Sequence, residues 1–136
     1  MSTGMLILDA CALIAVQRGE PGGDMVIDRI LASASGALMH GLNVCEVFYD
    51  DLRRDEKATI SRLLTDLARL EIRIEWGFGE SLVDRTARIK AHWRRISLAD
   101  SAALALAMER GGILLTSDHH ELDPLFAAGY PIEFIR

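Results

Sequence analysis

The stretch MLILDACALIA, residues 5–15, decides the fold class of this chain. Four apolar residues lead into one acid, Asp9, after which the chain becomes apolar again and rich in small side chains. A short apolar run is typical of a buried strand, and the segment after Asp9 predicts a helix that ends at the loop RGEPGG, residues 18–23. Asp9 therefore stands where a strand passes into a helix, at the edge of a core, where an uncompensated carboxylate is costly.

The same alternation of strand and helix continues along the 136 residues. Further short apolar or alternating runs predict strands at residues 36–40, 72–76, 112–116 and 131–135. Amphipathic or apolar segments between them predict helices at residues 23–34, 42–54, 57–70, 80–95, 98–110 and 120–129. Strands that alternate with helices indicate a parallel sheet that is covered on both faces. We therefore expect one α/β domain over residues 1–136, a three-layer α/β/α sandwich with a central parallel sheet.

Composition narrows the classes of function. Hydrophobic residues make up 50% of the chain, which argues against an intrinsically disordered protein. The formal net charge of −5 gives no general basic field for nucleic acid, although a local basic patch remains compatible with it. No apolar run approaches the roughly 20 residues of a membrane span, so no membrane association is expected. Cys11 and Cys45 form no disulfide framework, which favours a reduced, cytoplasmic location.

Four acids occupy the positions where parallel α/β sheets hold their ligands. Asp9 ends the first predicted strand, and Asp118 follows the strand at 112–116 by two residues. Glu46 lies in the helix after the second strand, and Asp100 opens the helix before the strand at 112–116. Ligands of such sheets bind beyond the carboxyl ends of the strands, so we expect all four side chains to point into one cleft.

Each acid also has an ordinary structural interpretation. Glu46 can be an exposed helix acid. The others stand at capping positions, which are Asp9 before a helix, Asp100 three residues after Ser97, and Asp118 three residues before Glu121. The flanks of the four acids are apolar, however, whereas the acids of DDLRRDE, residues 50–56, have polar neighbours. The set therefore indicates a functional site more strongly than any one member does.

A cluster of four carboxylates requires a cation. Two carboxylates about 5 Å apart repel by roughly 3 kcal/mol at an effective dielectric constant near 20. A ligand set made only of carboxylate oxygens suits Mg²⁺ or Mn²⁺ and not Zn²⁺. Mg²⁺ held by carboxylates commonly also binds a substrate phosphate, and such a site activates and orients water for in-line attack. The expected chemistry is therefore hydrolysis of a phosphodiester bond.

Four short motifs in this order resemble the PIN domain, and more narrowly the VapC-type toxins of bacterial toxin–antitoxin pairs. They are LDACALIA, NVCEV, SLADSAALALA and LLTSD, and the resemblance extends over residues 5–134. It implies a parallel α/β/α sandwich in which Mg²⁺ or Mn²⁺ is held by Asp9, Glu46, Asp100 and Asp118. It further implies a metal-dependent endoribonuclease that acts as a toxin, is inhibited by a cognate antitoxin protein and forms homodimers.

Two supporting residues follow from the resemblance. Thr116 matches the family's hydroxyl residue in the pattern Thr-x-Asp, and Asn43 matches an asparagine three residues before the helix acid. Residues three apart share a helix face, so Asn43 is placed to orient Glu46 or to bind a metal water. The chain departs from the family after its first acid, where Ala10 and Cys11 replace the usual small hydroxyl residues. A thiol is a poorer donor than a hydroxyl, so we expect Cys11→Ser to preserve or increase activity.

The segment DRTARIKAHWRR, residues 84–95, carries five cationic side chains. They form either a solvated helix face or a patch that guides RNA phosphates to the cleft. Lys90 and Arg94 are the candidates for substrate binding. Trp93 has the chemistry to stack on a base, but a place in the core or in a dimer interface is the preferred interpretation.

Other classes of function fit less well. A receiver-type phosphoacceptor needs a lysine at the end of a late strand, and a haloacid-dehalogenase-type phosphatase needs an Asp-x-Asp motif, whose second position is Cys11 here. His119 and His120 have no neighbouring cysteine for zinc and are interpreted as surface-loop residues. The alternative that remains open is a catalytically weak PIN-like module that binds RNA or protein.

Overall fold

The central element of the fold is the first strand, β1 (Leu6–Leu8), which pairs with a strand on each side. In this computed structural model, which describes residues 4–136, the strands form one parallel sheet in the order β3-β2-β1-β4-β5. The others are β2 (Ala37–His40), β3 (Ile72–Glu75), β4 (Ile113–Thr116) and β5 (Ile132–Phe134). Because β1 is paired along both edges and covered on both faces, its three residues are all apolar and buried.

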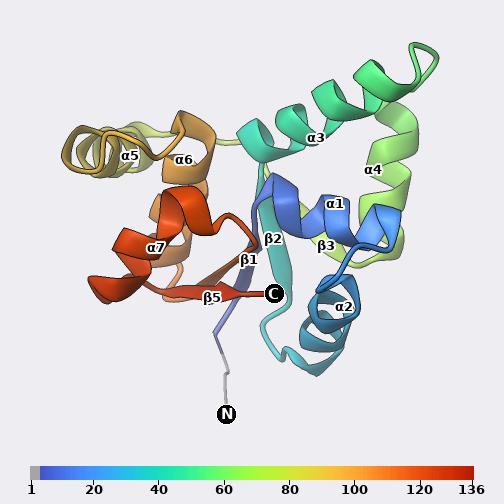
Figure 1. Ribbon diagram of the computed structural model, residues 1–136. Helices are drawn as coiled ribbons and strands as arrows, with labels where there is room; N and C mark the ends of the chain where they lie inside the picture. Colours follow the sequence, from blue (N-terminus) through green and yellow to red (C-terminus); the bar gives the residue numbers. More distant parts are fainter. Residues whose placement is uncertain (1–3) are drawn as a thin grey trace.

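Helices cover both faces of the sheet, as Figure 1 shows. The helices of the first half of the chain lie on one side, and they are α1 (Ala10–Arg18), α2 (Gly23–Ala32), α3 (Gly41–Arg54) and α4 (Ile60–Arg69). Those of the second half lie on the other side, and they are α5 (Glu80–His92), α6 (Leu98–Glu109) and α7 (His119–Ala127). The expected three-layer α/β/α sandwich with a central parallel sheet is therefore confirmed.

The strands supply side chains to two separate hydrophobic cores. Leu6 and Leu8 pack with α1 to α4, whereas Ile7 points to the opposite face and packs with α5 to α7. This alternation is the ordinary period of a strand, and it explains why a continuous apolar run is needed when both faces are covered. Of the helices in residues 4–136, none combines the length and the apolar character of a membrane-spanning segment.

A glycine pair lets the chain turn tightly from α6 into β4. Gly111 has a φ of 63°, the left-handed conformation that commonly ends a helix. A Cβ atom at Gly112 would lie 2.2 Å from the carbonyl oxygen of Met5. Only glycine at position 112 therefore allows β4 to begin directly beside β1.

Two local expectations are wrong. The helix expected at residues 80–95 ends at His92, and Trp93 begins a turn in which the N–H of Ile96 donates to the carbonyl of Trp93. This turn is stabilised by tertiary contacts that a helical periodicity does not contain. The pair His119–His120 begins α7 instead of lying in a surface loop, although both side chains are exposed.

The strand order reverses at the carboxyl end of β1, which is where open α/β sheets form a crevice. The chain passes from β1 to β2 and β3 on one side, and later returns to place β4 and β5 on the other side. Ligands of open α/β sheets bind where the strand order reverses in this way. Asp9 directly follows β1, and Asp118 follows β4 after one intervening residue, so both acids stand beside this crevice.

Candidate metal centre

Asp9 caps α1 with one oxygen and leaves the other without a partner. Its Oδ1 accepts a hydrogen bond of 2.9 Å from the N–H of Ala12, as the capping interpretation expected. Its Oδ2 is buried and has no hydrogen-bond partner in the described part of the chain. A buried carboxylate oxygen in this state is costly unless a cation or another donor meets it. Capping therefore accounts for one carboxylate oxygen of Asp9 and leaves the other available to a cation.

Asp100 lies in the first turn of α6, where its carboxylate is not needed for capping. Ser97 is the N-cap, and its Oγ accepts a hydrogen bond of 3.1 Å from the N–H of Asp100. In a capping box the third residue of the helix would bind back to the N–H of Ser97. That N–H instead donates to Oε1 of Glu121 at 2.6 Å. The carboxylate of Asp100, which is 5% exposed, is therefore left for the site.

Asp118 is held at the start of α7 by bonds on both sides. Its Oδ1 accepts a hydrogen bond of 3.0 Å from the N–H of Glu121, which is the expected cap. Its own N–H donates to Oγ1 of the buried Thr116 at 3.0 Å. The Thr-x-Asp pattern thus fixes the backbone of Asp118 at the end of β4.

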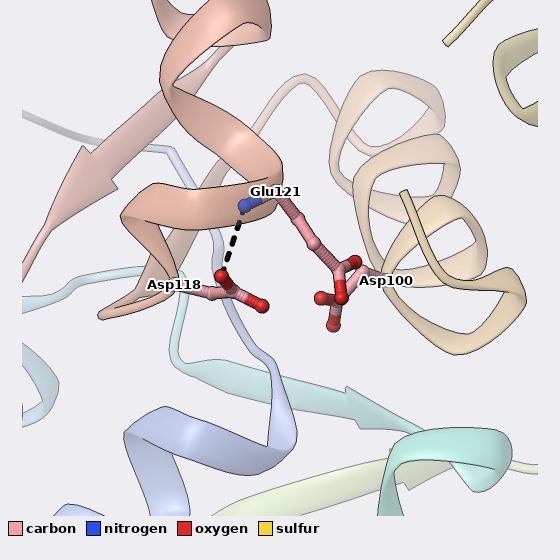
Figure 2. Close-up of side chains that lie close together, drawn as sticks. All are labelled: Asp100, Asp118 and Glu121. Atoms are coloured by element: carbon pink, nitrogen blue, oxygen red, sulfur yellow. Dashed lines mark hydrogen bonds between the residues drawn. The ribbon is translucent and has the colours of Figure 1, made fainter. Parts of the chain in front are cut away.

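Three acids converge closely enough to share one ion, one from α6, one from α7 and one from the residue that caps α7. Asp100, Asp118 and Glu121 each offer a carboxylate oxygen, and these oxygens lie within 4.8 Å of one another. Figure 2 shows the carboxylates of Asp100 and Glu121 pointing toward each other, with that of Asp118 beside them. The structure therefore brings together two of the four expected acids with one that sequence reasoning assigned to capping alone.

Glu46 and Asn43 project from α3 toward the same region. Asn43 is fully buried, and its Nδ2 donates to the carbonyl of Ala99 at 3.2 Å, which ties α3 to the first turn of α6. Its Oδ1 has no hydrogen-bond partner within residues 4–136. Partial desolvation and the negative charges of Glu121 and Asp118 raise the pKa of Glu46. Glu46 thus contributes to the same field, although it is not one of the three acids within 4.8 Å.

The acidic cluster, defined here as Asp9, Glu46, Asp100, Asp118 and Glu121, is electrostatically strained. Burial raises the pKa of Asp9 to about 7 and outweighs the hydrogen bonds from Thr116 and Ala12, which lower it, and the charges of Asp118 and Glu46 add smaller upward contributions. Burial also raises the pKa of Asp100 to about 9, and the other four acids of the cluster add to the shift. Carboxylates this close resist ionising together unless a cation compensates them.

The donors of the acidic cluster fit a hard divalent ion. They are carboxylate oxygens, and the orphaned Oδ2 of Asp9 and Oδ1 of Asn43 are further oxygens in need of a partner. Mg²⁺ and Mn²⁺ prefer such ligands, whereas Zn²⁺ sites usually contain nitrogen or sulfur. His119 is engaged elsewhere, because its ring bonds Asp123 and the carbonyl of Arg136 at 2.7 Å each and stacks on Phe134.

Cys11 lies beside the acidic cluster at a position where a small hydroxyl residue was expected. Burial raises the pKa of its thiol to about 12, and the charges of Asp9, Asp100 and Asp118 reinforce the shift. The thiol is therefore neutral at physiological pH and offers no thiolate to a metal ion. Cys11 therefore lies next to the acidic cluster, but its neutral thiol would be a weak metal ligand.

Lys90 and Arg94 are the expected substrate-binding residues, and their surroundings differ from each other. The Nζ of Lys90 donates to the carbonyls of Arg94 at 2.8 Å and Ile96 at 2.6 Å, so it secures the turn after α5. The Arg94 side chain is exposed and has no ion-pair partner among the described residues. Trp93 packs at the edge of the second core, as preferred, with its indole N–H donating to Tyr130 Oη at 3.1 Å.

Comparison with solved structures shows the same fold at low sequence identity. A toxin–antitoxin complex from Klebsiella pneumoniae contains a chain of 16% identity with a TM-score of 0.72, covering 96% of this chain and 98% of that one. DNA-bound VapBC from Salmonella typhimurium matches at 16% identity and a TM-score of 0.68, covering 97% and 98%. Mycobacterium tuberculosis VapC20, described as a sarcin-ricin loop cleaving toxin, matches at 16% identity and a TM-score of 0.66, covering 92% and 95%.

Comparison of the sequence itself gives a more specific result. No curated protein matches the chain significantly. The sequence profile of the PIN domain, however, matches residues 6–123, a span that begins at β1 and extends beyond Glu121. All five members of the acidic cluster lie within it. The chain, expected from its motifs to resemble the PIN domain, therefore belongs to the PIN domain family.

Proposed function

We propose that this protein is a metal-dependent endoribonuclease that acts as the toxin of a toxin–antitoxin pair. The observation that carries the proposal is the convergence of Asp100, Asp118 and Glu121, whose carboxylate oxygens lie within 4.8 Å of one another, and the charges of Asp9 and Glu46 act on the same group. Helix capping accounts for one oxygen each of Asp9, Asp118 and Glu121, but it gives no reason to bury Asp100 or to bring the acids so close together. A site for Mg²⁺ or Mn²⁺ does.

The residues have separate tasks in this proposal. Asp9, Asp100 and Asp118 are the principal ligands, and Glu46 and Glu121 complete the negative field around the ion. A bound divalent ion would supply charge neutralisation and Lewis-acid activation of water against a phosphodiester. Catalysis in this proposal depends on the chain holding the carboxylates in place before substrate arrives.

Two uncharged residues keep that arrangement rigid. Asn43 binds the carbonyl of Ala99 and so fixes the first turn of α6, which carries Asp100. Thr116 binds the N–H of Asp118 and lies close enough to Asp9 to lower its pKa. The side chains of Asn43 and Thr116 are therefore positioning groups rather than chemical participants.

The proposed substrate and partners come from the fold relatives. RNA is the proposed substrate, since one relative is described as a sarcin-ricin loop cleaving toxin. A cognate antitoxin protein is the proposed inhibitor, since other relatives are toxin–antitoxin complexes. We include a homodimer and a cytoplasmic location in the proposal, and no membrane partner.

A catalytically weak binding module is the second candidate, and the Ala10–Cys11 pair is the observation that favours it. The thiol of Cys11 is neutral where relatives are expected to have a hydroxyl that positions water or phosphate. Such a module would bind RNA or protein through the same crevice without cutting.

Cleavage of total RNA by the purified, antitoxin-free chain separates the two candidates. The reaction is run with Mg²⁺, with Mn²⁺ and with EDTA, beside Asp9→Asn and the exposed-acid control Asp28→Asn. Discrete fragments that need metal, persist in Asp28→Asn and vanish in Asp9→Asn are expected. Absence of cleavage with either metal, from protein shown to be folded, would favour the binding module.

A further inference from the structure

A cavity opens directly beside the acidic cluster. It has a volume of about 400 Å³ and lies between the turn after α5 and the first turns of α7. Glu121 lines it and also belongs to the cluster, so the two sites share a wall. A ligand in this cavity would lie next to any group that reacts at the metal centre. Its volume is in the range of pockets that hold small organic ligands.

The rim of this cavity is cationic in an otherwise acidic protein. Arg94 and Arg95 supply its positive charge, His92 and His120 also line it, and Glu121 is the only acid in its lining among residues 4–136. Neither arginine forms an ion pair with a carboxylate in residues 4–136. These charges are therefore available to a negatively charged ligand.

The larger cavity, of about 690 Å³ between α1, α3 and α4, has the opposite character. It also contains arginines, but acids stand among them. Arg18 and Arg54 pair with Asp50, and Arg62 pairs with Asp66. Because three of its four arginines are already paired with acids, this cavity attracts an anion less than the smaller one does.

The cavity beside the cluster also has an apolar interior and an aromatic wall. Ile96 and Leu125 line it and are buried, while the half-buried Trp93 forms part of its wall. The indole of Trp93 is held by its hydrogen bond to Tyr130. Flat apolar surface next to free cations is the combination by which proteins hold single-stranded nucleic acid.

The turn that carries these residues is secured before any ligand arrives. Lys90 binds the carbonyls of Arg94 and Ile96, and Glu121 binds the N–H of Ser97 at the end of the turn. A turn fixed at both points loses less conformational entropy when it binds a ligand.

We propose that this cavity binds one nucleotide of single-stranded RNA next to the bond cleaved at the metal centre. Its base lies against Trp93 and the apolar interior, and its flanking phosphates bind Arg94 and Arg95. The positive charge of the rim would attract RNA and an acidic protein segment alike. RNA is the proposed ligand because the cavity adjoins the metal centre. The inference rests on the proposed ribonuclease function and adds a substrate subsite to it.

The test measures the fluorescence of Trp93 after the other tryptophan has been replaced. The chain contains two tryptophans, so Trp76→Phe leaves Trp93 as the only indole fluorophore. In the full chain carrying Asp9→Asn to prevent cleavage, Trp93 fluorescence is titrated in Mg²⁺ buffer with a short oligouridylate, a short oligoadenylate and a hexaglutamate peptide. The titrations are repeated with Arg94→Glu/Arg95→Glu and with Arg53→Glu/Arg54→Glu, a matched adjacent pair on α3.

RNA is expected to quench the fluorescence of Trp93. The RNA affinity obtained from the titration should fall about tenfold in Arg94→Glu/Arg95→Glu and less than about twofold in the α3 pair. Equal effects of the two pairs, or equal quenching by hexaglutamate, would overturn the subsite. Metal-dependent cleavage by the unmodified chain with an unchanged KM in Arg94→Glu/Arg95→Glu would overturn the subsite alone. Absence of both cleavage and RNA binding would overturn the ribonuclease function as well. Thermal melting of each variant shows that it is folded.

Discussion

The backbone N–H of Ser97 donates a hydrogen bond of 2.6 Å to Oε1 of Glu121, so a side chain from α7 closes the first turn of α6. In an isolated helix the third residue, Asp100, would take that role. Because Glu121 does so instead, Asp100 is free to face the acidic cluster. One residue thus joins two helices and sets the position of two carboxylates.

Glu121 should therefore have separable effects on stability and on metal binding. Glu121→Gln keeps an oxygen for Ser97 but removes the charge, so we expect Mn²⁺ affinity to fall about tenfold while folding is preserved. Glu121→Ala also removes the acceptor and should cost about 1–2 kcal/mol of unfolding free energy. Calorimetric titration with Mn²⁺ and urea denaturation measure the two quantities. Equal Mn²⁺ affinity in all three proteins would exclude Glu121 from the centre.

The metal-free protein should become less stable as the pH rises. The pKa values of Asp9 and Asp100 are about 7 and about 9 in the folded chain, above their ordinary 3.8. The folded state therefore binds these protons more tightly than the unfolded state, so the contribution of these two groups to stability is full below pH 3.8 and is lost as the pH rises through about 7 and about 9. Scanning calorimetry in EDTA between about pH 4 and pH 9 should show a falling Tm.

Two comparisons assign that decline to the cluster. Asp100→Asn cannot ionise, so in EDTA near pH 8 we expect its Tm to exceed that of the parent by about 3 °C or more. Asp28→Asn, an exposed acid on α2, should leave the Tm unchanged. Added Mn²⁺ should raise the Tm of the parent more near pH 8 than near pH 5. A Tm of Asp100→Asn below that of the parent at both pH values would contradict the assignment.

Asn43 should matter for stability because its amide is buried and bound to another helix. Asn43→Ala removes the bond to the carbonyl of Ala99, which links α3 to α6, and leaves a cavity where the buried amide stood. We expect a loss of about 1–3 kcal/mol in urea denaturation, together with weaker Mn²⁺ binding as the first turn of α6 loosens. Cys45→Ala, an exposed change on the same helix, is the control. A loss no larger than that of the control would show that the tether is unimportant.

Cys11 should be chemically inert in spite of its place beside the centre. Because burial and neighbouring acids raise the pKa of its thiol to about 12, iodoacetamide near pH 8 should modify the exposed Cys45 and spare Cys11. Peptide mass spectrometry after alkylation measures this selectivity. We also expect Cys11→Ser to preserve or increase RNA cleavage, and a large loss would show that the thiol has a role of its own.

Lys90 should act on RNA through the turn it secures. Lys90→Met keeps the apolar stem but removes the ammonium that binds the carbonyls of Arg94 and Ile96. We expect RNA affinity to fall about threefold and hydrogen exchange of residues 93–97 to accelerate. Lys57→Met, on an exposed lysine, is the matched control. Lower affinity without faster exchange would mean that Lys90 contacts the RNA directly.

The layers of the fold could be predicted because burial on both faces leaves a direct trace in the sequence. β1 is a continuous apolar run, and the helices around it show one apolar face each or, like α6, are apolar all round. The end of α5 could not be predicted in this way. His92 to Arg95 continue a helical pattern, and it is the contacts of Lys90 and Trp93 that turn the chain.

Part of the acidic cluster could be predicted from the sequence for a similar reason. Acids between apolar flanks stand out, which is why Asp9, Asp100 and Asp118 could be singled out. Glu121 was hidden because its spacing from Asp118 is that of a helix cap, and that cap does form through its backbone N–H. Its side chain serves Ser97 and the cluster instead, and this depends on how α6 and α7 pack, which no local pattern contains.

The central place of β1 has a consequence during synthesis. β1 is made first, but one of its two partners, β4, belongs to the last quarter of the chain. A nascent chain that ends before Ile113 carries Asp9, Glu46 and Asp100 but lacks Asp118 and Glu121. The acidic cluster therefore cannot assemble until the chain has been synthesised as far as Glu121 and this segment can pack against α6.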